Sequence, residues 1–308
     1  MILTVTMNPS IDKLYYVEGN TLGAVQRVLE VSNTAGGKGL NVSRVSSLLG
    51  EDVTAMGLVG GHIGGYFESL ITGNIRSAFT HVKSETRSCI NVWDTTNGVS
   101  TEYLEPGAPI TAEEAEQFFC DFRRELGQAD VITISGSMPK GAPADSYEQL
   151  ITLCREAGKP VLLDTSGENL RRGAAMKPDF IKPNTDELAQ LLGHPVSGME
   201  EAIEAAKALH EGGIRWVAVS LGSKGAILVC DEGVFHGQPP RIEPVNTVGC
   251  GDSMVAGFAV AMSRGLGAED ALRLAVAVSA ANALTKGTGS FEQQDFERLH
   301  PLVTISRL

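Results

Sequence analysis

The sequence predicts an α/β protein whose mostly parallel sheet is covered by helices on both faces. Short, almost continuously apolar runs alternate with amphipathic stretches over most of the 308 residues, a pattern typical of parallel strands buried between two helical layers. The chain is 43% hydrophobic and 20% charged, which is typical of a folded globular protein. A chain of this length can bury a full core.

The expected strands are short and rich in Val, Ile and Leu, as buried strands are. They are ILTVTM (2–7), VTAMGLV (53–59), DVITISG (130–136), PVLLD (160–164), DFIKP (179–183) and RWVAVSLG (215–222). Stretches that are typical of helices lie between them, at 39–49, 65–73, 111–126, 145–157, 186–192 and 199–212. Ligands in such sheets bind beyond the carboxyl ends of the strands, so a site is expected in the loops that follow them.

Two segments interrupt this alternation. Residues at about 10–34 and 86–106 have the pattern of strands and turns, and Asn97-Gly98 is a strong hairpin signal. We expect them to form a small extra sheet. Either it is a lid that closes over a substrate, or it is an edge hairpin or a dimer surface. Because no repeat or linker divides the chain, residues 1–308 are expected to form a single domain that carries this lid.

Charge and cysteine content exclude several classes of protein. The net charge of −12 and the pI near 5.0 argue against nonspecific electrostatic binding to nucleic acid or to an anionic membrane. The five cysteines are widely separated and include no C-x-x-C pair, which argues against a disulfide framework and a zinc site. The sequence shows no secretory signal and no apolar run long enough for a membrane span. We expect a cytoplasmic protein.

The first of three candidate motifs is AGGKGLNVSR (35–44). Lys38 supplies a point charge and Asn41 a bidentate amide at the start of a helix. The glycines let the backbone approach a ligand closely, and they are Gly36, Gly37 and Gly39. This arrangement suits an anionic or polyhydroxylated substrate. The alternative is a tight turn with a solvated lysine.

The second motif, IKPNTDEL (181–188), directly follows an expected strand. Asn184 is a good helix N-cap, and Glu187 stands where a capping box requires it. The cap is a complete structural explanation by itself. The same two side chains could also hold the water shell of a magnesium ion, which prefers oxygen ligands.

The third motif, NTVGCGDSMVAG (246–257), is expected to open a helix. A helix N-terminus exposes unpaired N–H groups, and Gly249 and Gly251 would let those groups converge on one oxyanion. Asp252 is then placed to accept a proton from a hydroxyl that attacks this anion, which is the task of a base in phosphoryl transfer.

Other interpretations of this third motif fail on spacing or lack a partner. Met254 stands where a dinucleotide fingerprint needs its third glycine, and no G-x-x-x-x-G-K-[ST] motif occurs. Gly251-Asp252-Ser253 also suggests a serine hydrolase. None of the six histidines lies in a motif that marks it as the base, so the hydrolase stays a minor alternative.

In combination the motifs point to a known family. AGGKGLN, KPNTDEL, SLGSKGA (220–226) and NTVGCGDSMVAG, in this order over nearly the whole chain, resemble the ribokinase-like sugar kinases of the PfkB family. Five stretches are most similar to the branch of tagatose-6-phosphate kinase and 1-phosphofructokinase. Enzymes of this branch convert a ketohexose monophosphate into a bisphosphate with ATP. The five stretches are MNPSID (7–12), TAGGKGLNVSR (34–44), ETRSCI (85–90), TEYLEPG (101–107) and SGSMPKG (135–141). The resemblance implies a three-layer α/β/α domain with a β-sheet lid.

The resemblance also implies roles for residues in the third motif. The backbone amides of Gly249, Cys250 and Gly251 would form the anion hole, and Asp252 would be the catalytic base. The family usually has alanine where Cys250 stands, a change that leaves the backbone donors in place.

The resemblance implies ATP and Mg²⁺ as cofactors. Asn184 and Glu187 would serve the metal, with Asn184 and Lys182 near the ATP phosphates. The remaining residues expected at the ATP site are Ser220, Gly222, Gly225 and Asn282. Asn282 is the weaker match, because its helix of small residues (275–285) is equally well explained by core packing.

On the sugar side, the resemblance implies hydroxyl contacts from Asp12, Gly37, Lys38 and Asn41. Arg87, together with Lys38, would bind the phosphate already on the sugar, since a guanidinium pairs bidentately with phosphate oxygens. The preferred ketose phosphate stays open between tagatose 6-phosphate and fructose 1-phosphate. A 6-phosphofructokinase or other sugar kinase of the family, and a catalytically silent sensor, are alternatives, and the lid could pair two copies into a homodimer.

Overall fold

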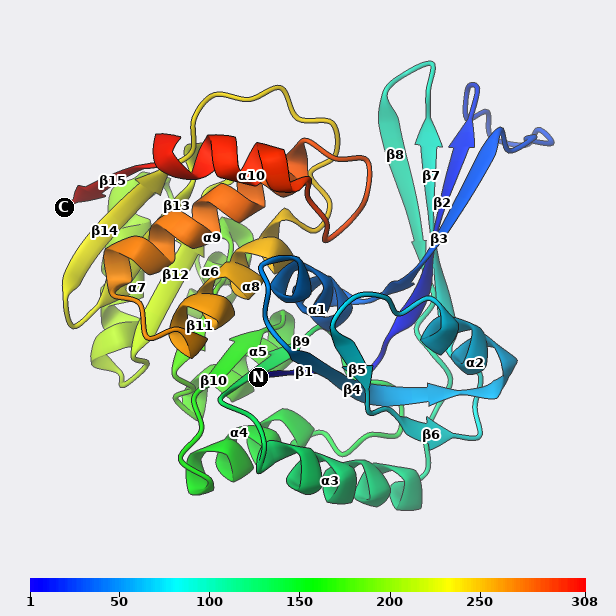
Figure 1. Ribbon diagram of the computed structural model, residues 1–308, viewed down its shortest axis with the longest axis horizontal. Helices are drawn as coiled ribbons and strands as arrows, with labels where there is room; N and C mark the ends of the chain where they lie inside the picture. The colour runs from blue at the N-terminus through cyan, green and yellow to red at the C-terminus, as the bar shows by residue number, and fades with distance from the viewer.

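The computed structural model describes residues 1–308 and contains two β-sheets (Figure 1). The main sheet has eleven strands. In order across the sheet they are β15 (Thr304–Arg307), β14 (Gly233–Gln238), β13 (Ala226–Cys230), β12 (Trp216–Ser220), β11 (Phe180–Ile181), β10 (Val161–Asp164), β9 (Val131–Ser135), β1 (Ile2–Thr6), β4 (Val53–Gly60) and β5 (Ile75–Ser77), with β6 (Thr80–Val82) also paired to β4.

The centre of this sheet is parallel, as the sequence predicted. All pairs from β4 through β1, β9, β10 and β11 to β12 run parallel, and each of these six strands overlaps an expected one. The strands β13, β14 and β15 form an antiparallel edge that the sequence analysis did not predict. A strand that turns straight back as a hairpin needs no helix, so it escapes a search for alternating strands and helices.

Helices cover both faces of the main sheet, and alternate residues of one strand enter different cores. On β10, Leu162 packs in the core of one face and Leu163 in the core of the other. The first face carries α1 (Lys38–Leu48), α8 (Cys250–Ser263), α9 (Ala268–Ala283) and α10 (Gln293–Leu299), and the second carries α3 (Ala112–Leu126), α4 (Ser146–Glu156), α5 (Gly167–Ala175), α6 (Thr185–Leu192) and α7 (Gly198–Glu211).

Three helices differ from the sequence expectation, and one of them, α10, lies where no helix was expected. The helix expected at 65–73 is α2, Gly61–Ser69, and it continues through two glycines that look like a break in the sequence. A Cβ on Gly64 would lie 3.2 Å from Thr86 Oγ1, so this glycine allows close packing inside the helix. The second helix, α5, was not expected, because its sequence GENLRRGAA contains two glycines and few apolar residues.

The second sheet has four strands, in the order β3 (Glu30–Gly36), β2 (Ser10–Val17), β7 (Arg87–Asp94) and β8 (Val99–Leu104). The expected lid segments thus form one small sheet, which stands away from the main body (Figure 1). At its hairpin, the Asp94 carboxylate accepts hydrogen bonds from the backbone N–H groups of Thr96 and Asn97, and Gly98 has a φ of 64°. None of the helices in the molecule is both long and apolar enough to span a membrane.

Candidate active site

The N-terminus of α8 is open to a ligand. Its N-cap, Gly249, is left-handed with a φ of 83°, and no side chain caps the helix. The N–H of Cys250 donates to the Thr247 carbonyl at 3.3 Å, whereas those of Gly251 and Asp252 have no acceptor in the protein. Free N–H groups at a helix N-terminus are the usual basis of an anion site.

Close packing of the backbone requires glycine at this helix end. A Cβ on Gly249 would lie 2.6 Å from the Gly289 nitrogen. A Cβ on Gly251 would lie 3.3 Å from Lys182 Nζ, so the ammonium group of this lysine lies beside the first helical turn. The amides and the ammonium group therefore favour negative charge at the same place.

Asp252 is held in this first turn with its carboxylate buried. Its Oδ2 accepts a hydrogen bond of 2.7 Å from Asn41 Nδ2. Burial raises the pKa of the Asp252 carboxyl to about 6, although Lys38 and Asn41 both favour its ionised form and Asp164 opposes it. A carboxyl with a pKa near this value is ionised at neutral pH and basic enough to take a proton.

The orientation of Asn41 is set by a residue that the sequence analysis did not single out. Arg44 is half-buried and donates to Asn41 Oδ1 at 3.2 Å, which leaves the amide nitrogen of Asn41 to donate to Asp252. The Arg44 guanidinium also donates to the carbonyls of Ala35 and Thr288, each at 2.6 Å. Arg44 thus ties α1 to its surroundings and fixes the partner of Asp252.

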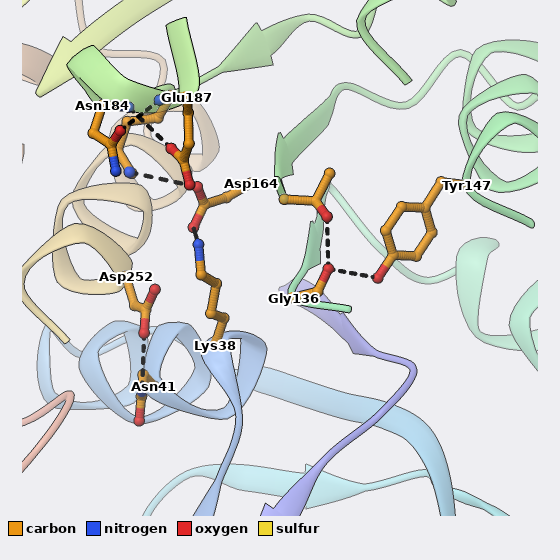
Figure 2. A network of polar contacts seen from close by, with 10 residues as sticks. Lys38, Asn41, Gly136, Tyr147, Asp164, Asn184, Glu187 and Asp252 are labelled. Atoms are coloured by element: carbon orange, nitrogen blue, oxygen red, sulfur yellow. Dashed lines mark hydrogen bonds and ion pairs between the residues drawn. The ribbon is translucent and has the colours of Figure 1, made fainter. Parts of the chain in front are cut away.

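A second buried carboxylate, Asp164, holds the two lysines of the site (Figure 2). It ends β10, and its Oδ2 and Oδ1 lie 3.4 Å from Lys38 Nζ and from Lys182 Nζ, respectively. Burial disfavours the charge of Asp164, but the two ammonium groups outweigh burial and lower the pKa of this carboxyl. In return, Asp164 raises the pKa of Lys38. Sequence reasoning missed Asp164, although a carboxylate at the end of a buried parallel strand was a usable signal.

Asn184 and Glu187 form the complete capping box of α6. Glu187 N–H donates to Asn184 Oδ1 at 2.8 Å, and Asn184 N–H donates to Glu187 Oε2 at 3.0 Å. The cap leaves Glu187 Oε1 without a hydrogen bond in the protein, and Figure 2 shows this side chain extending toward Asp164. No group of three or more His, Cys, Asp and Glu side chains is arranged to hold a metal. The residues present fit a magnesium ion that keeps most of its waters and uses one or two carboxylates.

The residues expected near ATP lie beside this cap. Ser220 ends β12 and forms an isolated bridge with Asn184, and a short 3₁₀ turn, Gly222–Lys224, follows. Gly222 and Gly225 have φ angles of 60° and 85°. A Cβ on Gly225 would lie 1.9 Å from the Gly237 carbonyl oxygen, so the turn requires glycine there.

Both atoms of the Asn282 side-chain amide have hydrogen-bond partners in the protein. Its side chain is fully buried on α9 and donates to the Val248 carbonyl at 3.0 Å. Its amide oxygen accepts from Ser290 N–H at 3.1 Å. In the structure Asn282 therefore supports the loop before α8, and its expected place in the ATP pocket stays a prediction.

The residues expected at the sugar lie where the lid joins the main body. Asp12, on β2, accepts from Ser10 Oγ at 2.6 Å, and burial raises the pKa of its carboxyl. Gly37 is the N-cap of α1 with a φ of 100°. Arg87, at the start of β7, donates to the Asn8 carbonyl from two nitrogens and to the Glu105 carbonyl from a third, at 2.8–3.1 Å.

The sequence matches the family model described as pfkB family carbohydrate kinase over residues 5–295. The chain belongs to this family. As a carbohydrate kinase of the pfkB family, it is a phosphotransferase with an alcohol group as acceptor, and the resemblance found in the sequence motifs is confirmed. The expected ribokinase-like α/β fold is confirmed as well.

Solved structures of several phosphofructokinases are similar over the full length. A Staphylococcus aureus protein assigned as a phosphofructokinase is 33% identical with a TM-score of 0.85, and the alignment covers 100% of this chain and 99% of that chain. Phosphofructokinase-2 from Escherichia coli, in complex with substrates and products, is 28% identical over 98% of both chains with a TM-score of 0.91. A Thermotoga maritima protein assigned as a 1-phosphofructokinase is 26% identical over 100% of this chain and 99% of that chain, with a TM-score of 0.84.

The hydrolase alternative has no support in this pfkB kinase. Ser253 is fully buried, and its Oγ donates to the Gly249 carbonyl at 2.8 Å. No histidine lies within hydrogen-bond distance of its hydroxyl, because the Gly249 carbonyl is its one partner. The hydroxyl serves the helix backbone and is not placed as a nucleophile.

Proposed function

We propose that this chain uses ATP and Mg²⁺ to phosphorylate a ketohexose monophosphate, tagatose 6-phosphate or fructose 1-phosphate, to the 1,6-bisphosphate. The observation that carries the proposal is Asp252, a buried carboxyl with a raised pKa of about 6 in the first turn of a helix whose N-terminus has free amides. A base beside an anion site is what transfer of a phosphoryl group to a hydroxyl requires.

In the proposed reaction Asp252 accepts the proton of the attacking sugar hydroxyl. The N–H groups of Gly251 and Asp252, with that of Cys250 at the same helix end, stabilise charge on the transferring phosphoryl group. Lys38 and Lys182 add positive charge on either side of Asp164. Since Asp164 is ionised, it keeps both ammonium groups in place while neutralising part of their charge.

The ATP phosphates are proposed to lie between the start of α8 and the start of α6, beside the turn formed by Ser220, Gly222 and Gly225. Glu187 and Asn184 would hold Mg²⁺ through its water shell. When bound, the ion supplies positive charge that offsets the negative charge of the phosphates. The role of the protein side chains is to position it without replacing its waters.

The sugar phosphate is proposed to lie between the lid and α1, with its hydroxyls near Asp12, Gly37, Lys38 and Asn41. Arg87 uses three of its N–H groups on backbone carbonyls. A guanidinium has five such donors, so two are left for a phosphate. These two, with Lys38, would bind the phosphate already on the sugar.

The first test is to incubate the protein with ATP, Mg²⁺ and each of tagatose 6-phosphate, fructose 1-phosphate and fructose 6-phosphate, and to compare kcat/KM from ADP release. We expect the highest value with one of the first two. A preference for fructose 6-phosphate would favour the second candidate, a 6-phosphofructokinase, which the similarity to phosphofructokinase-2 bound to fructose 6-phosphate supports. If the protein releases no ADP with any of these three sugar phosphates or with other sugars, a catalytically silent sensor is the better interpretation.

The assignment of the sugar end is tested with Arg87→Ala. We expect a large rise in KM for the sugar phosphate with KM for ATP nearly unchanged. Arg27→Ala, which removes an exposed arginine from the lid loop, is the matched control. An effect of Arg87→Ala on ATP alone would contradict the assignment.

The lid is proposed to pair two copies of the chain. Its outer strands expose apolar side chains, among them Tyr103 and Leu104 on β8, which are 55% and 65% exposed. Such side chains on an unpaired edge favour association. Analytical ultracentrifugation should find a dimer that Leu104→Lys weakens, and a wild-type monomer at micromolar concentration would contradict the pairing.

A further inference from the structure

A cavity of about 390 Å³ lies at the amino ends of three parallel strands, away from the proposed active site. Pro160 and Val161 line it where β10 begins, Asp179 directly before β11 and Arg215 directly before β12. The carboxyl ends of the same strands carry the residues of the active site, such as Asp164 on β10. Since β10 has four residues, and three rises therefore separate its first residue from its last, the two ends are roughly 10 Å apart.

The cavity is lined by basic side chains that have no ionic partner. Its charged lining residues are Arg155, Lys159, Lys177, Arg215 and one acidic residue, Asp179. None of the four cations lies within 4.0 Å of a carboxylate. Outside the cavity, Asp130 is close enough to Lys159 for the lysine to lower the pKa of its carboxyl. In a chain with a net charge of −12, such a group of unpaired cations needs an explanation.

Helix dipoles explain only part of this cluster. Arg155 lies in the last turn of α4 and donates to the Met176 carbonyl, so it stabilises a helix C-terminus. The dipole effect falls off beyond the last turn. Lys159 and Arg215 lie three and four residues beyond the ends of α4 and α7, and helix capping does not account for them.

Lys177 stands where the backbone favours glycine. It has a φ of 55° and is the one non-glycine residue of the chain with a positive φ. Its N–H donates to the Ala174 carbonyl at 2.9 Å, and it follows the C-cap of α5, a position at which glycine is usual. The chain thus keeps a cation at the rim of the cavity at the cost of backbone strain.

We propose that this cavity binds a small molecule that carries two or more phosphate groups. Two arginines provide planar forks for phosphate oxygens and two lysines provide point charges. The volume is in the range of small-molecule sites, and a single phosphate would fill little of it. One acid against four cations leaves an excess of positive charge that suits a polyphosphate.

The test is calorimetric titration of the full chain with inorganic tripolyphosphate. We expect two binding events for the wild type, one at the active site and one at the cavity. The double variant Arg155→Ser/Arg215→Ser should lose one event, or weaken it at least tenfold, with KM values for ATP and the sugar phosphate unchanged. The control is Arg123→Ser/Arg241→Ser, which removes two exposed arginines outside the cavity and should keep both events.

A second variant separates binding from folding. Lys177→Gly removes one cation of the cavity, and glycine adopts the positive φ without strain. This variant should therefore be at least as stable as the wild type and still bind tripolyphosphate more weakly at the cavity. Repeating the titrations with ATP and with fructose 1,6-bisphosphate distinguishes a nucleotide from a sugar bisphosphate as the ligand, because the preferred one should show the greater loss in the double variant.

Three outcomes would overturn the proposal. Equal binding by the wild type and the double variant would show that the active site alone takes the anion. A loss of binding with an equal rise in KM for ATP would show that the cavity is not a separate site. Binding of poly(A) but not of tripolyphosphate would make this face a nucleic-acid surface instead of a small-molecule site.

Discussion

The helices α8 and α6 both begin at the carboxyl edge of the sheet, yet their N-termini are built in opposite ways. At α6, Asn184 and Glu187 satisfy each other's backbone N–H groups in a complete capping box. At α8, a left-handed glycine takes the cap position, no side chain contributes, and the N–H groups of Gly251 and Asp252 have no acceptor in the protein.

This difference determines which of the two helix ends is free to bind an anion. At an N-terminus with a capping box, side chains accept hydrogen bonds from the first backbone amides, and this stabilises the helix. Only the side-chain oxygens that the cap does not use are then available to bind a ligand's water shell. An N-terminus without a cap lacks about 1 kcal/mol of stabilisation and keeps its amides for the ligand. The two ends therefore suggest separate tasks, phosphoryl stabilisation at α8 and metal positioning at α6.

The change with the largest expected effect is Asp252→Asn. The amide can still accept the hydrogen bond from Asn41 but cannot take a proton, so we expect kcat to fall by about 10²- to 10⁴-fold. ATP binding, measured by calorimetry, should be nearly unchanged. Turnover close to that of the wild type would show that another group is the base.

The same variant should be more stable than the wild type at neutral pH. Because the folded pKa of Asp252 is raised to about 6, its contribution to stability is fully present below the unfolded pKa and is lost as pH rises through 6. Asparagine does not ionise, so Asp252→Asn avoids this loss. The free energy of unfolding should rise by at most about 3 kcal/mol at pH 7.5, which corresponds to a pKa raised by roughly two units. Urea titrations at pH 4.5 and 7.5 should show a gain that grows with pH.

The next effect in size is that of Gly249→Ala. The added Cβ would lie 2.6 Å from the Gly289 nitrogen, so the helix end or the loop must move, and kcat should fall by about 10²-fold as the amides lose their positions. Gly193→Ala is the matched control, because Gly193 is also left-handed, at a φ of 78°, with nothing within 4 Å of its added Cβ.

The comparison of these two glycine variants separates backbone strain from the clash. Both should lose about 1–2 kcal/mol of stability from the left-handed backbone, but only Gly249→Ala should lose activity. If Gly249→Ala keeps full activity and loses no more stability than Gly193→Ala, the packing of the α8 end against Gly289 does not position the amides.

A further prediction uses the pKa of the proposed base. Because Asp252 must be ionised to accept a proton, kcat/KM should be level above pH 7 and fall tenfold per pH unit well below the pKa of about 6. A decline that begins near pH 4 instead would mean that the Asp252 carboxyl is not the titrating group, or that it is not buried in the free enzyme.

The sequence predicted the central strands and both helix ends, because these depend on local signals. The glycines before Asp252 and the Asn-Glu spacing at α6 are visible within one turn. The partners of these residues are not, since Asn41 and Asp252 are 211 positions apart and Lys38 and Asp164 are 126 apart. Asp164 and Arg44 act on groups that only the folded chain brings near them. The sequence VLLD marks Asp164 as a carboxylate at a strand end but does not indicate the two lysines that it holds, and nothing local in NVSR indicates the role of Arg44.

The smallest expected effect, and the sharpest test of the contrast between the helix ends, is that of Glu187→Gln. Glutamine can serve in a capping box as glutamate does, so the stability of α6 should change little, while the lost charge should raise the Mg²⁺ concentration for half-maximal rate by about tenfold. The control is Glu114→Gln, the same change in the capping box of α3. It should leave the magnesium requirement unchanged but lower stability, because Glu114 Oε1 also accepts from Lys83 N–H and glutamine has only one acceptor oxygen. If Glu187→Gln leaves the magnesium requirement as unchanged as Glu114→Gln does, while Glu187→Ala lowers only stability, the cap is the whole function of Glu187, and the metal must be held by other groups, with Asp164 the first to examine.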